Sequence, residues 1–226
     1  MTEELQAAYD TLLAAFGPQH WWPAESADEM IIGALLTQNT NWKNVEKALA
    51  GLRRQGSLSL AAIAELETET LAELIRPSGY FRQKAQRLRL LARSVLDAGG
   101  LPKLAEKPTP ELRRWLLKLK GIGPETADSI LLYAFERPVF VIDAYTLRIG
   151  SRHDWFAPAT DYAAAQTFFT RHLPGDSALY NEFHALLVRV GKEFCRPKKP
   201  DCARCPLYSL YREPGPGRST SRKSDV

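Results

Sequence analysis

The chain has few of the features that would place it in a membrane or outside the cell. Among its 226 residues, no apolar run approaches the length of a membrane-spanning helix. The first residues, Met1 to Leu5, lack the basic and apolar regions of a signal peptide. We therefore expect a cytoplasmic monomer without a membrane partner.

Cysteine and histidine are also scarce. The three cysteines all lie within eleven residues: Cys195, Cys202 and Cys205. Clustered cysteines in a reducing compartment indicate metal ligands rather than disulfides. The four histidines share no metal-ligand spacing, and we interpret them as structural or surface residues: His20, His153, His172 and His184.

No segment shows the sustained alternation of a β-strand, so the expected fold class is all-α. Apolar residues recur at helical spacing in 3–15, 27–38, 43–53, 60–75, 82–98, 110–119, 125–134, 144–152, 161–172 and 177–192. A hydrophobic content of 45% is enough to bury one or two cores. The net charge of +4 and the pI near 9.0 suit a polyanionic partner.

A glycine hairpin stands between two of these expected helices. Gly121 and Gly123 are one residue apart, which allows a tight turn and exposes consecutive N–H groups. Pro124 follows, with the fixed φ and missing donor suited to the first turn of a helix. Such a helix start attracts anions, so a phosphate is the natural ligand. An ordinary tight turn between packed helices is the alternative.

A single carboxylate follows the hairpin. Asp143 ends the apolar run 138–142 and precedes a segment with helical spacing. It could be only the N-cap of that helix. Its place shortly after a phosphate-binding hairpin, behind an apolar lead-in that would dry its surroundings, makes it the candidate catalytic acid.

Segments 119–127 and 139–143 fit the motifs L-x-G-I-G-x-x-T-A and V-x-x-I/V-D. This pair resembles the helix-hairpin-helix DNA glycosylase superfamily, which includes endonuclease III. The resemblance extends to 35–40, to 78–85 and to the cysteine cluster, so it covers nearly the whole chain. It implies double-stranded DNA with damaged bases as the partner, a role in base excision repair, and a cytoplasmic, nucleoid-associated protein.

The resemblance also implies roles for single residues. Asp143 falls where the family keeps its essential aspartate. Gln38 falls where a glutamine enters the gap left by the extruded nucleotide, and Tyr80 or Phe81 falls where a bulky residue wedges the opposite strand. The hairpin residues expected to contact DNA are Lys120, Gly121, Ile122, Gly123 and Thr126.

One departure from the family decides the class of mechanism. Bifunctional members place a nucleophilic lysine two residues after the second glycine, and here that position is Glu125. A carboxylate cannot form a Schiff base with the deoxyribose, so strand cleavage by β-elimination loses its reagent. We expect a monofunctional hydrolase in which Asp143 stabilises the oxocarbenium-like sugar and guides a water to its anomeric carbon.

The expected substrate is a base that is already a good leaving group, such as a cationic N-alkylated purine. The residues expected to line its pocket are Trp21, Trp22, Pro23, Trp42 and Glu125. Indole faces attract cations and stack on bases, although these tryptophans could also be core residues. The W-W-P and T-Q-N-T-x-W segments resemble the 3-methyladenine glycosylases built on the endonuclease III scaffold, which also have a glutamate at the lysine position. A carboxylate at position 125 would favour a cationic base; a solvated first-turn residue is the alternative.

The cysteines match the first three ligands of the C-x6-C-x2-C-x5-C iron–sulfur loop of endonuclease III, and the fourth position is Tyr211. We favour a retained but atypical [4Fe–4S] cluster completed by Tyr211 or water, although such clusters normally have four cysteines. The alternatives are a lost cluster, with the loop held by packing alone, and zinc, whose usual fourth ligand is not at hand.

By analogy with the family, segment 23–135 forms one helical domain, with the helix-hairpin-helix at about 110–134. Segments 1–22 and 136–212 form the second, with the cysteine loop, and a base-binding cleft lies between the two. The basic tail 213–226 is rich in breakers and is expected to be disordered.

Two other functions stay open. One is a bifunctional glycosylase and lyase acting on oxidised pyrimidines, and the other is a catalytically weak protein that binds damaged DNA.

Overall fold

The computed structural model describes residues 1–21 and 24–210. Throughout these residues the secondary structure is helical and no β-strand occurs, so the predicted all-α fold is confirmed. Four parts of the predictions lie outside the described residues: Trp22, Pro23, Tyr211 and the tail 213–226. No helix in the described ranges is both long and apolar enough to cross a bilayer.

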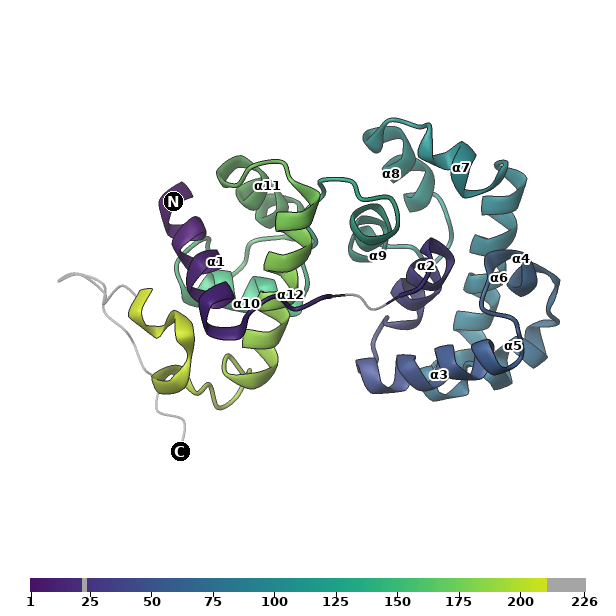
Figure 1. The fold of residues 1–226 in the computed structure, drawn as a ribbon, viewed down its shortest axis with the longest axis horizontal. Helices are drawn as coiled ribbons and strands as arrows, with labels where there is room; N and C mark the ends of the chain where they lie inside the picture. The colour runs from purple at the N-terminus through teal and green to yellow at the C-terminus, as the bar shows by residue number, and fades with distance from the viewer. Residues whose placement is uncertain (22–23, 211–226) are drawn as a thin grey trace. The chain divides into compact units, whose positions relative to one another are not determined.

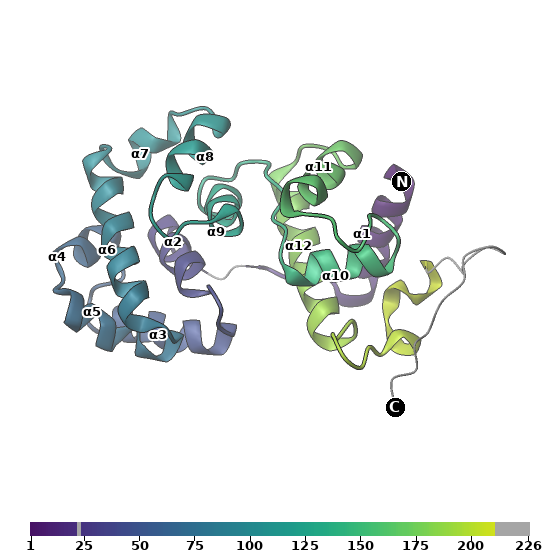
Figure 2. The same ribbon diagram turned by 180° about the vertical axis from the view of Figure 1, so that it is seen from behind.

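The chain forms two compact helical units. Of the described residues, unit 1 contains 1–19, 142–174 and 183–210, while unit 2 contains 20–21, 24–141 and 175–182. Figures 1 and 2 show the helices from opposite sides.

Ten helical segments of the described chain lie wholly within unit 2. They are α2 (Ala27–Leu36), α3 (Trp42–Arg54), α4 (Leu60–Glu65), α5 (Thr68–Leu74), η1 (Arg76–Ser78), α6 (Phe81–Asp97), α7 (Gly100–Ala105), α8 (Thr109–Leu117), α9 (Pro124–Ser129) and the π-helical segment η2 (Ile130–Ala134). The long helix α6 packs along α4 and α5, as both views show (Figures 1 and 2). Its buried face carries Leu88, Leu91 and Val95 at helical spacing.

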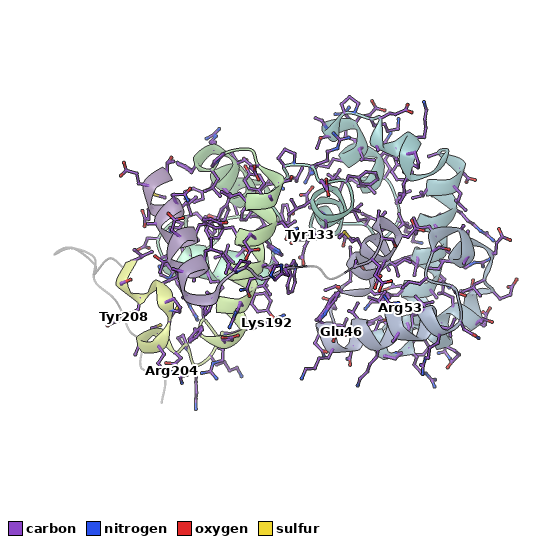
Figure 3. All side chains as sticks on the ribbon, in the orientation of Figure 1. Glu46, Arg53, Tyr133, Lys192, Arg204 and Tyr208 are labelled. Carbon is purple, nitrogen blue, oxygen red and sulfur yellow. The ribbon has the colours of Figure 1, made fainter. Side chains whose placement is uncertain are left out.

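Helix α2 begins at a variant of the capping box, in which the glutamate side chain accepts from the residue before the N-cap. The hydroxyl of Ser26 accepts a hydrogen bond from Glu29 N at 3.2 Å, and the Glu29 carboxylate accepts one from Glu25 N. The same carboxylate pairs with Arg53 of α3 at 2.8 Å, so one buried acid ties two helices together; Arg53 is labelled in Figure 3.

Two helices differ from the periodicity of the sequence. The helix expected over 60–75 breaks at Leu66, whose backbone is extended. On either side of the break, Arg89 of α6 donates to Thr68 Oγ1 and Arg93 donates to the carbonyl of Ala64. These contacts with α6 favour two short helices over one. The additional helix α7 begins at Gly100, the second of two consecutive glycines with φ in the left-handed region.

Unit 1 contains α1 (Thr2–Phe16), α10 (Ala144–Arg152), α11 (Tyr162–His172), most of α12 (Ser177–Glu193), η3 (Cys202–Arg204) and η4 (Pro206–Leu210). Its core is aromatic: the ring of Phe169 meets Trp155 and Phe183 edge-on, and Phe183 also contacts Tyr9 of α1. Helix α1 packs against η4. This core positions α10 and α12, which carry the catalytic candidate and its neighbour.

Candidate nucleic-acid interface and catalytic carboxylate

The glycine hairpin joins α8 to α9 and depends on one glycine for its shape. Gly121 has a φ of +91°, in the left-handed region, whereas Gly123 has an ordinary φ of −92°. Ile122 N donates to Leu119 O at 3.1 Å, but the N–H groups of Gly121 and Gly123 donate no hydrogen bond to the described part of the chain. Two backbone donors are therefore left for an external acceptor.

A partly buried ion pair joins the two helices that flank the hairpin. Arg113 of α8 donates through Nε and Nη2 to the two carboxylate oxygens of Asp128 on α9, at 2.6 and 3.0 Å. The Asp128 side chain is fully buried. Such a bidentate pair fixes the relative orientation of the two side chains as well as the distance between them. Ile122, one of the residues predicted to contact DNA, is buried in the core of unit 2. Its side chain therefore anchors the turn to that core.

Gln38 reaches the hairpin from the loop after α2. Its Nε2 donates to Gly121 O and to Thr126 Oγ1, both at 2.9 Å, and its Oε1 accepts from Arg87 Nη1 at 3.2 Å. Thr126 is buried at this contact. The structure thus brings together Gln38, Gly121 and Thr126, three of the predicted DNA-contacting residues, as one hydrogen-bonded network.

The two wedge candidates differ in their surroundings. Tyr80 is 69% exposed and has a φ of +46°, which is uncommon for a residue other than glycine. Phe81 packs partly against the core, with the guanidinium groups of Arg76 and Arg82 at 5.2 and 5.5 Å from its ring centroid. Only Tyr80 projects freely from its loop.

A buried lysine links the loops that carry Gln38 and Tyr80. Lys84 of α6 donates from Nζ to Leu36 O at 2.9 Å and to Ser78 O at 2.7 Å, two residues before each of those side chains. It is only 2% exposed. Burial and the charge of Arg87 lower the pKa of Lys84 to about 8. Sequence reasoning did not identify this residue.

Of the predicted base pocket, two tryptophans are described, and they lie together. The rings of Trp21 and Trp42 are 6.2 Å apart and tilted by 39°. The indole Nε1 of Trp42 donates to Glu46 Oε1 at 2.9 Å, which fixes the ring at the start of α3; Glu46 is labelled in Figure 3. Glu125 lies exposed in the first turn of α9.

Asp143 uses its two carboxylate oxygens differently. Oδ1 accepts from Thr146 N at 2.7 Å and caps α10. Oδ2 lies 3.6 Å from His184 Nε2 of α12, within ion-pair range, and both side chains are largely buried. Asp143 is therefore an N-cap, and its second oxygen is not used for capping.

The charged form of Asp143 is favoured despite burial. Burial alone would raise the pKa of this carboxyl, but the hydrogen-bonding and electrostatic contribution of His184 and the hydrogen bonds from Thr146 outweigh it. The pKa of Asp143 therefore lies below its ordinary value of 3.8. His184 was set aside with the other histidines in the sequence. The signal that could have identified it is its place in the buried stretch 183–188 of α12, since a histidine there needs a polar partner.

The three cysteines lie at the end of α12 and in the following loop, where Arg204 and Tyr208 are labelled in Figure 3. Cys195 is buried and its Sγ accepts from Arg152 Nη1 at 3.2 Å, whereas Cys202 is exposed. Burial raises the pKa of Cys205. No group of three or more Cys, His, Asp or Glu side chains suited to a metal ion occurs among the described residues. Three cysteines do not fit a four-thiolate cluster.

The sequence of residues 32–174 matches the model of the family described as "HhH-GPD superfamily base excision DNA repair protein". The chain belongs to this superfamily. The HhH-GPD match includes the hairpin, Gln38, Tyr80 and Asp143, so these residues lie in the part that defines the family. The predicted identification as a helix-hairpin-helix DNA glycosylase is confirmed.

Several HhH-GPD relatives match over most of their length. A Methanocaldococcus jannaschii protein named "Putative DNA repair glycosylase MJ1434" is 43% identical over 208 residues, 91% of this chain and 94% of its own. Endonuclease III of Thermotoga maritima is 30% identical over 196 residues, 85% of this chain and 87% of its own.

Solved structures agree with this assignment. The 3-methyladenine DNA glycosylase of H. pylori, MagIII, bound to 1,N6-ethenoadenine, is similar with a TM-score of 0.72 and 33% identity, over 85% of this chain and 97% of that one. A trapped endonuclease III–DNA covalent intermediate has a TM-score of 0.79 over 94% and 96% of the two chains, but at 21% identity it shows the shared fold alone.

Proposed function

We propose that this DNA repair glycosylase is monofunctional: it hydrolyses the N-glycosidic bond of a flipped-out damaged base and leaves the DNA strand intact. Two observations carry the proposal: the charged form of the Asp143 carboxylate is favoured, and position 125, where lyases of the family have their lysine, is a glutamate. Asp143 stabilises the positive charge that develops on the sugar and guides the attacking water.

The described lysines supply no obvious replacement nucleophile. A Schiff base requires an uncharged amine that can reach the sugar. Lys84 has a lowered pKa of about 8, but it is buried and its ammonium group is engaged by two backbone carbonyls. Lys120 is exposed, but it precedes the hairpin rather than occupying the position of Glu125. These placements support hydrolysis over β-elimination.

DNA binding in this proposal uses unit 2. The free N–H groups of Gly121 and Gly123 bind a phosphate without reading base sequence. Tyr80, which is exposed, acts as the wedge in preference to Phe81. Gln38 enters the gap left by the flipped nucleotide, and its contacts with Gly121 and Thr126 couple that insertion to the hairpin.

For the substrate we propose an N-alkylated purine such as 3-methyladenine. The paired rings of Trp21 and Trp42 offer a stacking surface, and the hydrogen bond to Glu46 increases the negative potential of the Trp42 indole, which favours a cationic base. A relative with 33% identity is a 3-methyladenine glycosylase whose structure holds 1,N6-ethenoadenine. Exposed Glu125 adds negative charge.

A base-release assay tests this function directly. Duplexes carrying 3-methyladenine, 7-methylguanine, ethenoadenine, an oxidised pyrimidine or a mismatched thymine are incubated with the enzyme, and free base and strand breaks are measured separately. Release of an alkylated purine without strand breaks is expected. Failure on every alkylated purine would refute the substrate, and a strong borohydride-trapped protein–DNA adduct would show that the lyase alternative is correct.

The third alternative, a protein that only binds damaged DNA, predicts a different result for one variant. If Asp143 is catalytic, Asp143→Asn abolishes base release and keeps DNA binding, because asparagine still caps α10. If the protein only binds DNA, the substitution changes nothing that can be measured.

The atypical [4Fe–4S] cluster is a separate proposal that rests on the spacing of the cysteines. The proposed mechanism of base release does not require it. Anaerobically purified protein that is brown and contains iron and acid-labile sulfide would support it. Colourless protein without iron would count against it.

A further inference from the structure

Three surface grooves of unit 2 differ in their charge. One is lined by Lys103, Glu106, Lys107 and Glu111 together with apolar residues, and its lysines pair with its glutamates. A second contains Lys47, Arg54 and Glu73, so it also holds an acid. The third, of about 300 Å³, is lined by Gln83, Gln86, Arg87, Leu90 and Lys120, and it contains no acidic residue.

The third groove, here called the α6 groove, borders the hairpin. Lys120 immediately precedes Gly121, and a Cβ at Gly121 would lie only 2.4 Å from the Cδ and Nε atoms of Arg87. Neither Lys120 nor Arg87 forms an ion pair within residues 1–21 and 24–210. Arg87 donates Nη1 to Gln38, and its other guanidinium donors make no hydrogen bond in the same ranges.

We propose that the α6 groove binds a backbone phosphate of the DNA next to the one held by the hairpin. Lys120 and Arg87 are unneutralised cations that offer only N–H donors, and the exposed amides of Gln83 and Gln86 each add an NH₂ group, which suits a phosphodiester. The contact is independent of base sequence, because phosphate oxygens carry no base identity. The proposal rests on the proposed function in one respect, namely that the ligand of unit 2 is duplex DNA.

The location of Arg87 gives this contact a second consequence. Arg87 holds the side-chain oxygen of Gln38, whose amide nitrogen holds the hairpin. A phosphate bound by Arg87 therefore sits one hydrogen bond from the residue proposed to fill the gap in the DNA. A DNA phosphate bound in the α6 groove would therefore influence the position of the Gln38 side chain through Arg87.

The sharpest test converts a groove amide into an acid of the same size. In Gln83→Glu, the new carboxylate lies four residues before Arg87 on α6, where it pairs with the guanidinium and repels a phosphate. Lys120→Met removes the other cation. The matched control is Gln55→Glu, which makes the same change in the groove that contains Lys47 and Arg54.

Affinity for an undamaged duplex is measured over a range of salt concentrations, with circular dichroism and thermal unfolding to show that each variant folds. For B-DNA, log K falls with log salt by about 0.9 for every phosphate contacted. Lys120→Met and Gln83→Glu are each expected to reduce this slope by about 0.9 and to weaken binding about fivefold at moderate salt. Gln55→Glu leaves the slope and the affinity unchanged.

The single-turnover rate of base release at saturating enzyme stays at the wild-type value in the control Gln55→Glu, because Gln55 lies in a different groove. Unchanged slopes in both groove variants would overturn the proposal, and so would an equal loss in Gln55→Glu, which would indicate a general charge effect. Since binding to undamaged DNA is the readout, the result stands whether or not an alkylated purine is released. Failure of the substrate assignment is therefore distinguishable from failure of the groove.

Discussion

His184 Nε2 lies 3.6 Å from Asp143 Oδ2, and the two side chains come from different helices of unit 1, α12 and the start of α10. The other oxygen of Asp143 is held by Thr146 N. One carboxylate oxygen is thus held by a backbone amide, and the other lies next to a buried imidazole. Such restraint fixes the direction in which Oδ2 can face a substrate.

His184→Phe is expected to lower the rate of base release about 10- to 100-fold, because a carboxylate misplaced by about an ångström loses that much. DNA affinity should stay within twofold of wild type. Single-turnover kinetics and binding to an uncleavable duplex separate the two. His184→Gln, which can still donate to Asp143, should recover part of the rate.

The matched control for this pair is His172→Phe, since His172 bonds the carbonyl of Phe168 within α11 instead of contacting Asp143. The positioning role of His184 would be excluded if both phenylalanine variants released base at the same rate. It would also be excluded if His184→Phe lost only DNA affinity.

Alanine substitutions at the two hairpin glycines are expected to have opposite effects on protein stability. Gly121→Ala places a side chain at a φ of +91° and against Arg87, and should destabilise the protein by about 2 kcal/mol. At Gly123 an added Cβ meets nothing within 4 Å, so Gly123→Ala should keep or slightly raise the stability. Its new methyl group nevertheless stands where a phosphate approaches the backbone, so duplex affinity should fall severalfold. Denaturant unfolding and duplex titration measure the two effects, and full affinity in Gly123→Ala would argue against phosphate binding at the hairpin amides.

Gln38 has both an internal contact and a proposed contact with DNA, and two variants separate them. Thr126→Val removes the hydroxyl that accepts from Gln38 but leaves Gln38 in place, at a cost of about 1 kcal/mol in stability. Gln38→Ala removes the internal contact and the gap-filling side chain. We expect Gln38→Ala to slow base release at least tenfold more than Thr126→Val. Equal rates in the two variants would mean that Gln38 only braces the hairpin.

The helices and the hairpin could be predicted from the sequence because their signals are local. Helical spacing over 3–15 and 144–152 corresponds closely to α1 and α10, and Gly-Ile-Gly-Pro marks the turn before α9. The break at Leu66 could not be predicted in this way, because it depends on side chains of α6 that lie more than twenty residues further along the chain.

For Asp143, the sequence offers two roles as alternatives that the structure shows to be compatible. The sequence allowed an N-cap or a catalytic acid, but a carboxylate has two oxygens, and only Oδ1 is used by the cap. His184 and Lys84 were missed because their roles depend on long-range contacts: Lys84, for example, bonds a carbonyl 48 residues away. No pattern within α6 indicates which backbone oxygen its ammonium group will meet.

Lys84 predicts a specific dependence of stability on pH. Its pKa is lowered from 10.5 to about 8 in the folded protein, so between these values the unfolded chain binds a proton that the folded protein lacks. The contribution of Lys84 to the free energy of unfolding therefore rises with pH across this window and is constant below it. In Lys84→Met the rise disappears, and in Lys103→Met, where the lysine replaced is exposed, it persists. Urea unfolding of the three proteins at intervals from pH 7 to 10.5 measures the difference. A parallel pH dependence in wild type and Lys84→Met would show that burial and the charge of Arg87 do not lower the pKa of Lys84.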